Sequence, residues 1–202
     1  MAVRNGMVDE DDEEEALFPG QDGLMLVPES DTPPHLRDLA AAAEIGDVDG
    51  LRRAVDNLNG SINEPVEDGD TVLHLTCLYG HLPCVQLLLE RGACLEVKDE
   101  DGAIPLHDAC AGGFAEIVQL LISGANDPEC VKRMLESVDV EGDTPLHHAA
   151  RGEHVDVIRL LLASGASPLK TNIYGKTPNE LSDPDTEARR ILEAAASAVA
   201  CQ

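Results

Sequence analysis

The stretch "GDTPLHHAARGEHVDVIRLLLASGA", residues 142–166, is the fullest copy of a pattern that recurs along this chain. Residues 69–93 read "GDTVLHLTCLYGHLPCVQLLLERGA", and residues 102–125 read "GAIPLHDACAGGFAEIVQLLISGA". Their first glycines are 33 and then 40 residues apart, and Gly175 follows Gly142 by another 33. A period of this length indicates a stacked solenoid, in which each unit buries its apolar side against its neighbours.

Each copy predicts a helix, a turn, a second helix and a loop. Thr71 and Thr144 are good N-cap residues, and Pro145 stands where the first helical turn tolerates proline. Val85 and Leu88 belong to an apolar stripe with helical spacing. We therefore predict an all-α solenoid of helix-turn-helix units with projecting turn or hairpin loops. The predicted units span about residues 36–66, 67–99, 100–139, 140–172 and 173–200, of which the first and last are atypical caps.

The composition is strongly acidic, with a net charge of −25 over 202 residues. Such a charge repels nucleic-acid phosphates and anionic membranes, so we expect no direct binding to nucleic acid or membrane. It attracts basic protein segments. The acidic start is unlike a signal peptide, and the six cysteines include no CxxC pair, which fits reduced thiols. We expect a monomeric protein of the cytoplasm, the nucleus or both.

Residues 1–35 have a different composition from the rest of the chain. They hold ten acids against one base, Arg4, together with several prolines and glycines. Such a segment buries too little apolar surface to offset the entropy of ordering, so we predict a disordered acidic tail. Two short apolar clusters, Leu17–Phe18 and Leu24–Val27, interrupt it. The tail either only solubilises the protein or carries a docking or activation motif that folds on a partner.

The repeated motifs Gly-x-Thr-Pro-Leu-His, Ala-Ala, Gly-His and Val-x-Leu-Leu-Leu closely resemble the ankyrin repeat, over about residues 36–198. The copies depart from it where Val72 replaces a proline, Ile104 replaces a threonine and Glu153 replaces a glycine. Ile104 thereby loses a capping hydroxyl, and we expect each departure to weaken its unit without altering the fold. The resemblance implies that protein partners bind the concave face, which the first helices and the projecting turns form.

The resemblance also indicates which positions face a partner. On the first helices they are Leu75, Leu78, Tyr79, Asp108, Ala111, Gly112, His148 and Arg151. On the turns, acids gather at Glu64, Glu67, Asp68, Asp70, Glu96, Asp99, Glu100, Asp101, Asp139, Glu141 and Asp143. Leu78 and Tyr79 are the best candidate hot spot, unless they are partly buried against the first unit. The acids either attract a basic segment or form an ordinary solvated rim, and Lys170 and Lys176 reverse the sign at the far end.

The sequence does not predict catalysis. Five of the seven histidines fall on repeat positions, where the resemblance implies structural hydrogen bonds: His74, His81, His107, His147 and His154. There is no phosphate-binding glycine loop, nucleophile elbow or HExxH motif. The cysteines are spread over successive repeats and do not suggest a zinc site. We therefore expect no enzyme activity, no bound metal and no cofactor.

The third unit is longer than the others because of the segment "NDPECVKR", residues 126–133. Asp127 followed by Pro128 can begin a helical turn. The insertion is either a neutral surface addition, which repeats tolerate in loops, or a finger that contacts a partner. Lys132 and Arg133 would make such a finger a basic spot on an acidic protein.

Two functions fit these features. The first is an adaptor or chaperone-like module that holds a basic protein segment on the concave face; some small ankyrin proteins escort basic ribosomal or proteasomal subunits in this way. The alternative is a transcriptional co-regulator, in which the acidic tail is the effector and the repeats are the docking platform.

Overall fold

A computed structural model describes residues 32–125 and 127–200. The predicted tail therefore lies outside the described residues, except for residues 32–35. These four join the first unit: Thr32 is buried, and the Leu36 amide donates to the Pro33 carbonyl at 2.8 Å.

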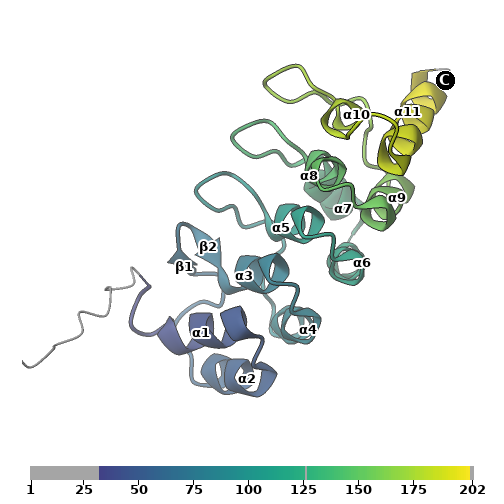
Figure 1. Cartoon of the computed structure of the whole chain (residues 1–202). Coiled ribbons are helices and arrows are strands. Elements are labelled where there is room, and N and C mark those ends of the chain that lie inside the picture. Colours follow the sequence, from purple (N-terminus) through teal and green to yellow (C-terminus); the bar gives the residue numbers. More distant parts are fainter. Residues whose placement is uncertain (1–31, 126, 201–202) are drawn as a thin grey trace, which may run out of the picture.

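Helices dominate the described residues and are arranged in two rows (Figure 1). The first helices of the successive units are α1 (Arg37–Ile45), α3 (Val72–Leu78), α5 (Pro105–Ala111), α8 (Pro145–Arg151) and α10 (Pro178–Leu181). The second helices are α2 (Val48–Asp56), α4 (Leu82–Glu90), α6 (Ala115–Gly124), α9 (Val155–Ala163) and α11 (Glu187–Ala200). Each helix packs on its counterparts in the neighbouring units, so the predicted all-α solenoid is confirmed.

Small residues on the first helices allow this close stacking. Cys77, Cys110 and Ala150 occupy equivalent positions and have no exposed surface. The stripe predicted on the second helices is also buried, with Val85 and Leu121 both fully inaccessible. Because aromatic residues make up only 2% of the chain, short aliphatic side chains fill the core between the two rows.

A histidine fixes the start of each of the central first helices. His147 Nδ1 accepts the Thr144 amide at 3.1 Å and lies 2.8 Å from the Thr144 hydroxyl. His107 Nδ1 accepts the amide of Ile104 at 3.0 Å, but isoleucine has no hydroxyl to add the second bond. The predicted loss of a capping hydroxyl at Ile104 is therefore confirmed.

The histidines also join neighbouring units. The distal nitrogens of His107 and His147 lie 3.3 and 3.1 Å from backbone carbonyls of the following unit. Those of His81 and His154 lie 2.9 Å from carbonyls at the end of the preceding first helix. The structural roles predicted for these four histidines are confirmed.

The turns between units project to one side of the stack (Figure 1). In the first of them β1 (Pro65–Glu67) pairs antiparallel with β2 (Asp70–Thr71). Each later turn tip donates a backbone amide to a carbonyl of the tip before it. The bonds run from Glu100 to Asp68 at 3.2 Å, from Val140 to Asp101 at 2.7 Å and from Ile173 to Glu141 at 3.0 Å. Gly69 permits the first of these approaches, since a Cβ there would lie 2.5 Å from the Glu100 nitrogen.

The insertion in the third unit forms an extra helix, α7 (Pro128–Glu136), which Asp127 caps by accepting the Cys130 amide at 2.8 Å. Its buried side chains Cys130, Met134 and Leu135 pack on the stack. Arg133 donates two bonds to Glu96, at 2.8 and 2.9 Å. The insertion is thus a packed helix and not a projecting finger, and Glu96 already has a basic partner.

Candidate protein-binding face

We call the surface formed by the first helices and the projecting turns the inner face. On it, Leu78 and Tyr79 are 44% and 50% exposed, so each is partly buried and still offers about half of its surface to a partner. Leu75 was expected to lie on the same surface but is only 6% exposed. This corrects the expectation for Leu75, whose apolar side chain is drawn into the core.

Around α8, the acids of the inner face are paired within the protein. His148 Nε2 lies 2.8 Å from Asp139 Oδ2. Arg151 donates to the fully buried Asp143 carboxylate, and Asn172 donates to its other oxygen at 2.8 Å. Asp139 and Asp143 therefore do not belong to an exposed rim, and the polar groups of His148 and Arg151 contact these acids within the protein.

Between α3 and α5, no lysine or arginine of the described residues forms an ion pair with the acids of the equivalent surface, and the nearest basic side chain is that of His74. By repeat register, Asp108 stands where the next unit has His148, and Ala111 stands where it has Arg151. Asp70 and Asp99 approach Asp108 closely enough to perturb its ionisation. We call Asp70, Asp99 and Asp108 the acidic triad.

The surroundings of Asp70 and Asp108 favour the protonated form of these two carboxyl groups. Burial raises the pKa of Asp108 to about 8, with further contributions from the charges of Asp70 and Asp99. Burial and the neighbouring Asp99 raise the pKa of Asp70 to about 6. Among the described residues, the buried Oδ2 atom of Asp108 has no hydrogen-bond partner. Asp70 and Asp108 thus hold a negative charge at a cost in free energy.

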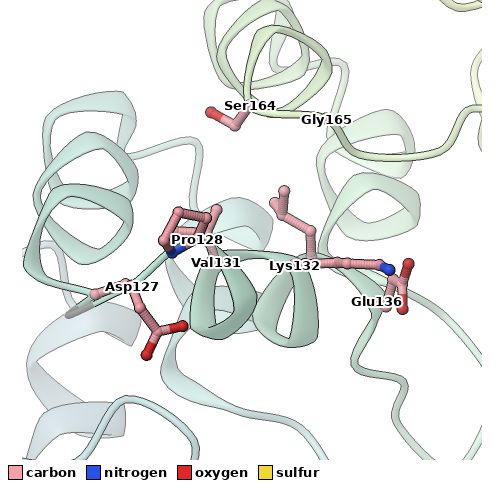
Figure 2. A pocket seen from close by; sticks show the side chains of 9 residues that line it. Asp127, Pro128, Val131, Lys132, Glu136, Ser164 and Gly165 are labelled. Atoms are coloured by element: carbon pink, nitrogen blue, oxygen red, sulfur yellow. The ribbon is translucent and has the colours of Figure 1, made fainter.

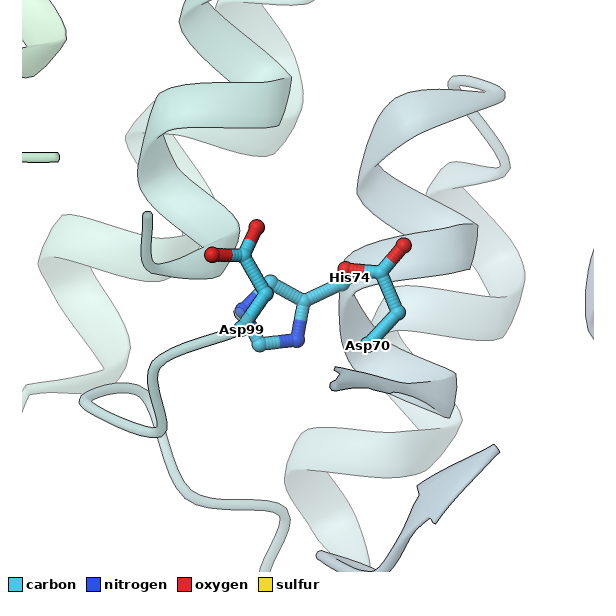
Figure 3. A group of neighbouring side chains, drawn as sticks. All are labelled: Asp70, His74 and Asp99. Atoms are coloured by element: carbon cyan, nitrogen blue, oxygen red, sulfur yellow. The ribbon is translucent and has the colours of Figure 1, made fainter. Parts of the chain in front are cut away.

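His74 lies against two members of the triad (Figure 3). One ring nitrogen of His74 and one oxygen each of Asp70 and Asp99 are all within 4.8 Å of one another. His74 Nδ1 accepts the Thr71 amide at 3.0 Å, so the neutral ring carries its proton on Nε2. An N–H nitrogen cannot bind a metal, and this cluster is therefore poorly suited to a transition-metal ion.

A second cluster of possible ligands comprises Asp139, Asp143 and His148. Arg151 is already bound to Asp143 there, and His148 is within hydrogen-bond distance of Asp139. A cation of the protein itself thus takes the place that a metal ion would need.

Comparison with protein families agrees with this architecture. Residues 39–128 match a model described as ankyrin repeats in three copies, and residues 141–173 match a model described as ankyrin repeat. Together these matches cover more than half of the chain. The chain belongs to the ankyrin repeat family. A search of curated proteins finds no match.

Ankyrin repeats are in general modules for protein–protein interaction, and proteins built from them are typically not enzymes. Within the two described ranges, no helix has both the length and the apolar character needed to cross a membrane.

The tips of the ankyrin turns change character along the stack. Glu67, Asp68, Glu100 and Asp101 are all exposed at the second and third units. At the next two units exposed apolar side chains appear at the tips: Val140 is 62% exposed beside Glu141, Ile173 is 67% exposed and Tyr174 is 65% exposed. These three side chains were not predicted as contacts, although the repeat register places Val140 and Ile173 at the position of Glu100.

The positive end expected beyond the fourth unit is partly neutralised. Lys170 donates to the Glu136 carbonyl at 2.7 Å, and Lys176 lies 3.7 Å from Glu180. At the other end, Glu64 lies 2.7 Å from His35. Glu141 remains half exposed, 3.6 Å from Arg151.

Helix α7 borders a hollow of about 620 Å³ on the side of the stack (Figure 2). Val131, Lys132 and Leu135 line it from α7, and Ser164 and Gly165 line it from the end of α9. The insertion thus shapes the surface beside the repeats, while the acidic triad belongs to the first helices and the turns.

Proposed function

We propose that this ankyrin repeat protein is an adaptor, or chaperone-like module, that holds a basic segment of another protein on its inner face. The observation that carries this proposal is the contrast between neighbouring units. The acids around α8 contact His148 and Arg151, whereas no lysine or arginine of the described residues forms an ion pair with the acidic triad between α3 and α5. A partner with lysine or arginine side chains would supply the missing charge.

The apolar side chains of the inner face support the same proposal. Leu78 and Tyr79 offer a half-exposed anchor on α3, and aromatic anchors are common among hot-spot residues. The turn tips run from acidic at Glu100 and Asp101 to apolar at Ile173 and Tyr174. A bound segment would accordingly place its basic residues on the second and third units and its apolar residues on the fourth and fifth.

The first test concerns the rate of association with a partner isolated by affinity purification and mass spectrometry. Changing Glu100→Gln and Asp101→Asn together should slow association several-fold at low salt, because exposed charges steer the encounter. At physiological ionic strength the effect should shrink, since charges are screened over about 8 Å. Stopped-flow or surface-based kinetics measure the association rate at low salt and at physiological ionic strength.

The matched control for that pair removes the same charge from the outer helices, through Glu116→Gln and Asp156→Asn. Both residues are exposed on second helices. An equal slowing by the two double variants would show that net charge, and not the inner face, governs association. An acidic partner, or binding that is indifferent to salt, would contradict the proposal.

The second test concerns the anchor. Tyr79→Ala should mainly speed dissociation, by about tenfold or more, because a hot-spot aromatic holds the complex after encounter. The free protein should melt almost as before, since the side chain is half exposed. An unchanged dissociation rate would remove Tyr79 from the interface.

The co-regulator alternative rests on the acidic and apolar composition of residues 1–35. Fusing these residues to a DNA-binding domain tests it with a reporter gene. Activation of the reporter would favour the co-regulator, and a silent reporter would favour the adaptor.

A further inference from the structure

We propose that residues 24–27, the apolar segment Leu-Met-Leu-Val, dock on the open side of the first unit and cap the start of the stack. This contact lies within the protein and goes beyond the partner proposed for the inner face. It assigns an occupant to a hollow that stays open among the described residues.

The open side belongs to α1 and α2, which begin the stack (Figure 1). Because α1 packs on α2 and α3, and α2 packs on α4, the opposite side of this pair has no neighbouring unit in the described part of the chain. A hollow of about 550 Å³ lies between the two helices, and its apolar or small lining residues are Ala41, Ala42, Ile45, Gly50 and Ala54. Ile45 is 74% exposed, so a large apolar side chain stands in water at its rim.

The repeat register explains the hollow. Gly50 and Ala54 of α2 stand where α4 has Cys84 and Leu88. Those two residues are 0% exposed, in a helix that packs on the preceding unit. The smaller residues of α2 leave the corresponding surface hollow. An apolar side chain that filled it would remove apolar surface from water, which favours docking.

The course of the chain brings residues 24–27 to this place. His35 lines the hollow, and just before it Thr32 is held on the first unit, where its carbonyl accepts from Arg37 Nε at 3.4 Å. Only four residues separate the segment from Thr32. An extended chain spans at most about 3.5 Å per residue, so the near end of the segment stays within about 18 Å of Thr32. Such a short tether gives an effective concentration on the order of millimolar, so a weak apolar contact suffices.

Charge at the hollow gives the docking a direction. Arg53 lines the hollow, is exposed, and forms no ion pair within the described ranges. Glu29 and Asp31 follow the apolar segment directly and can supply its acidic partner. Asp38 and Asp47 line the hollow too, so the apolar contact contributes most of the affinity. The pairing with Arg53 sets the side from which the segment enters.

The test uses the full chain with ¹³C-labelled methyl groups. We expect nuclear Overhauser effects between the methyl groups of Ile45 and those of Leu24, Leu26 or Val27. Changing Leu24→Ser and Leu26→Ser together should abolish these effects. The same change should speed amide hydrogen exchange in α1 and α2 by about tenfold, because the first unit loses its apolar cover.

Two further variants make the test specific. Leu17→Ser with Phe18→Ser is the matched control, since it alters the other apolar cluster before Thr32 and should leave both measurements as in the parent. Ile45→Ser alters the hollow and should speed exchange as the Leu24→Ser and Leu26→Ser pair does. Combining Ile45→Ser with that pair should add little, because all three changes remove one contact.

Three results would overturn the proposal, and each leaves the proposed function of the inner face untouched. If the Overhauser effects are missing and the Leu24→Ser and Leu26→Ser pair leaves exchange unchanged, the open side is simply the solvated end of the stack. If the control pair acts as strongly, residues 24–27 are not the specific occupant. If protection of α1 and α2 fades on tenfold dilution and sedimentation shows association, a second copy of the chain covers the hollow.

Discussion

Asp108→Asn is expected to stabilise the free protein, by about 2 kcal/mol at pH 7. The carboxylate is largely buried beside Asp70 and Asp99, and asparagine keeps its shape without its charge. For a chain of this size, that gain should raise the melting temperature by about 4–8 °C. The same substitution is expected to weaken binding of a basic partner, and this opposition distinguishes a binding residue from a structural one.

The pH dependence of this gain has a definite sign. In the unfolded chain Asp108 ionises near its ordinary pKa of 3.8, whereas in the folded protein its pKa is raised to about 8. Between these values the folded state holds more protons, so Asp108 reduces stability progressively as the pH rises from about 4 to 8. The advantage of Asp108→Asn should grow over the same range.

The ionisable groups that adjoin Asp108 also change the stability of the protein within this pH range. Burial and Asp99 raise the pKa of Asp70 to about 6, so its contribution to stability also falls as the pH rises, from about 4 to 6. The neighbouring histidine behaves oppositely: burial lowers the pKa of His74, which therefore costs stability as the pH falls below about 6.5.

Thermal melts of the parent, Asp108→Asn and Asp156→Asn at a series of pH values measure the effect. Because both variants share these neighbours, their difference isolates Asp108. A variant that melts below the parent at pH 7, or a difference that shrinks towards pH 8, would contradict the placement of Asp108 in an uncompensated site.

Leu121→Ala is expected to destabilise the stack by about 2–5 kcal/mol. Leu121 is 0% exposed on α6, which packs between α4 and α9, so truncation leaves a cavity in the middle of the solenoid. Chemical denaturation followed by circular dichroism measures the loss. Leu120→Ala is the matched control, since Leu120 is only partly buried on the same helix and should cost less. Equal losses from the two substitutions would contradict the assignment of the buried stripe.

Much of this fold could be predicted because the repeat indicates where in its unit each residue stands as well as which residue type is expected there. Once the glycines, histidines and leucines are aligned, each residue of one unit has a known counterpart in the next. The burial of Leu121 and the bonds of His147 follow from that register. The insertion could not be placed in this way: whether α7 packs or projects depends on contacts such as Arg133 with Glu96, which have no counterpart in the other units.

The candidate site could be predicted only in part. Whether a charged side chain is paired depends on which residue of the neighbouring unit lies beside it. Asp139 and Asp99 are equivalent by register, yet Asp139 is paired with His148 while Asp99 lies beside two further acids. Leu75 illustrates the same limit for an apolar side chain, which was expected on the surface and is buried. The distances between side chains of neighbouring units decide these cases, and the sequence pattern does not give those distances.

Hydrogen exchange of the full chain, with and without its purified partner, tests the central claim most directly. We predict that binding slows exchange in peptides that cover residues 67–79 and 99–112, where the acidic triad, Leu78 and Tyr79 lie. Peptides that cover the outer helices α4, α6 and α9 should exchange as in the free protein. Slowed exchange confined to those outer helices would contradict a partner held on the inner face.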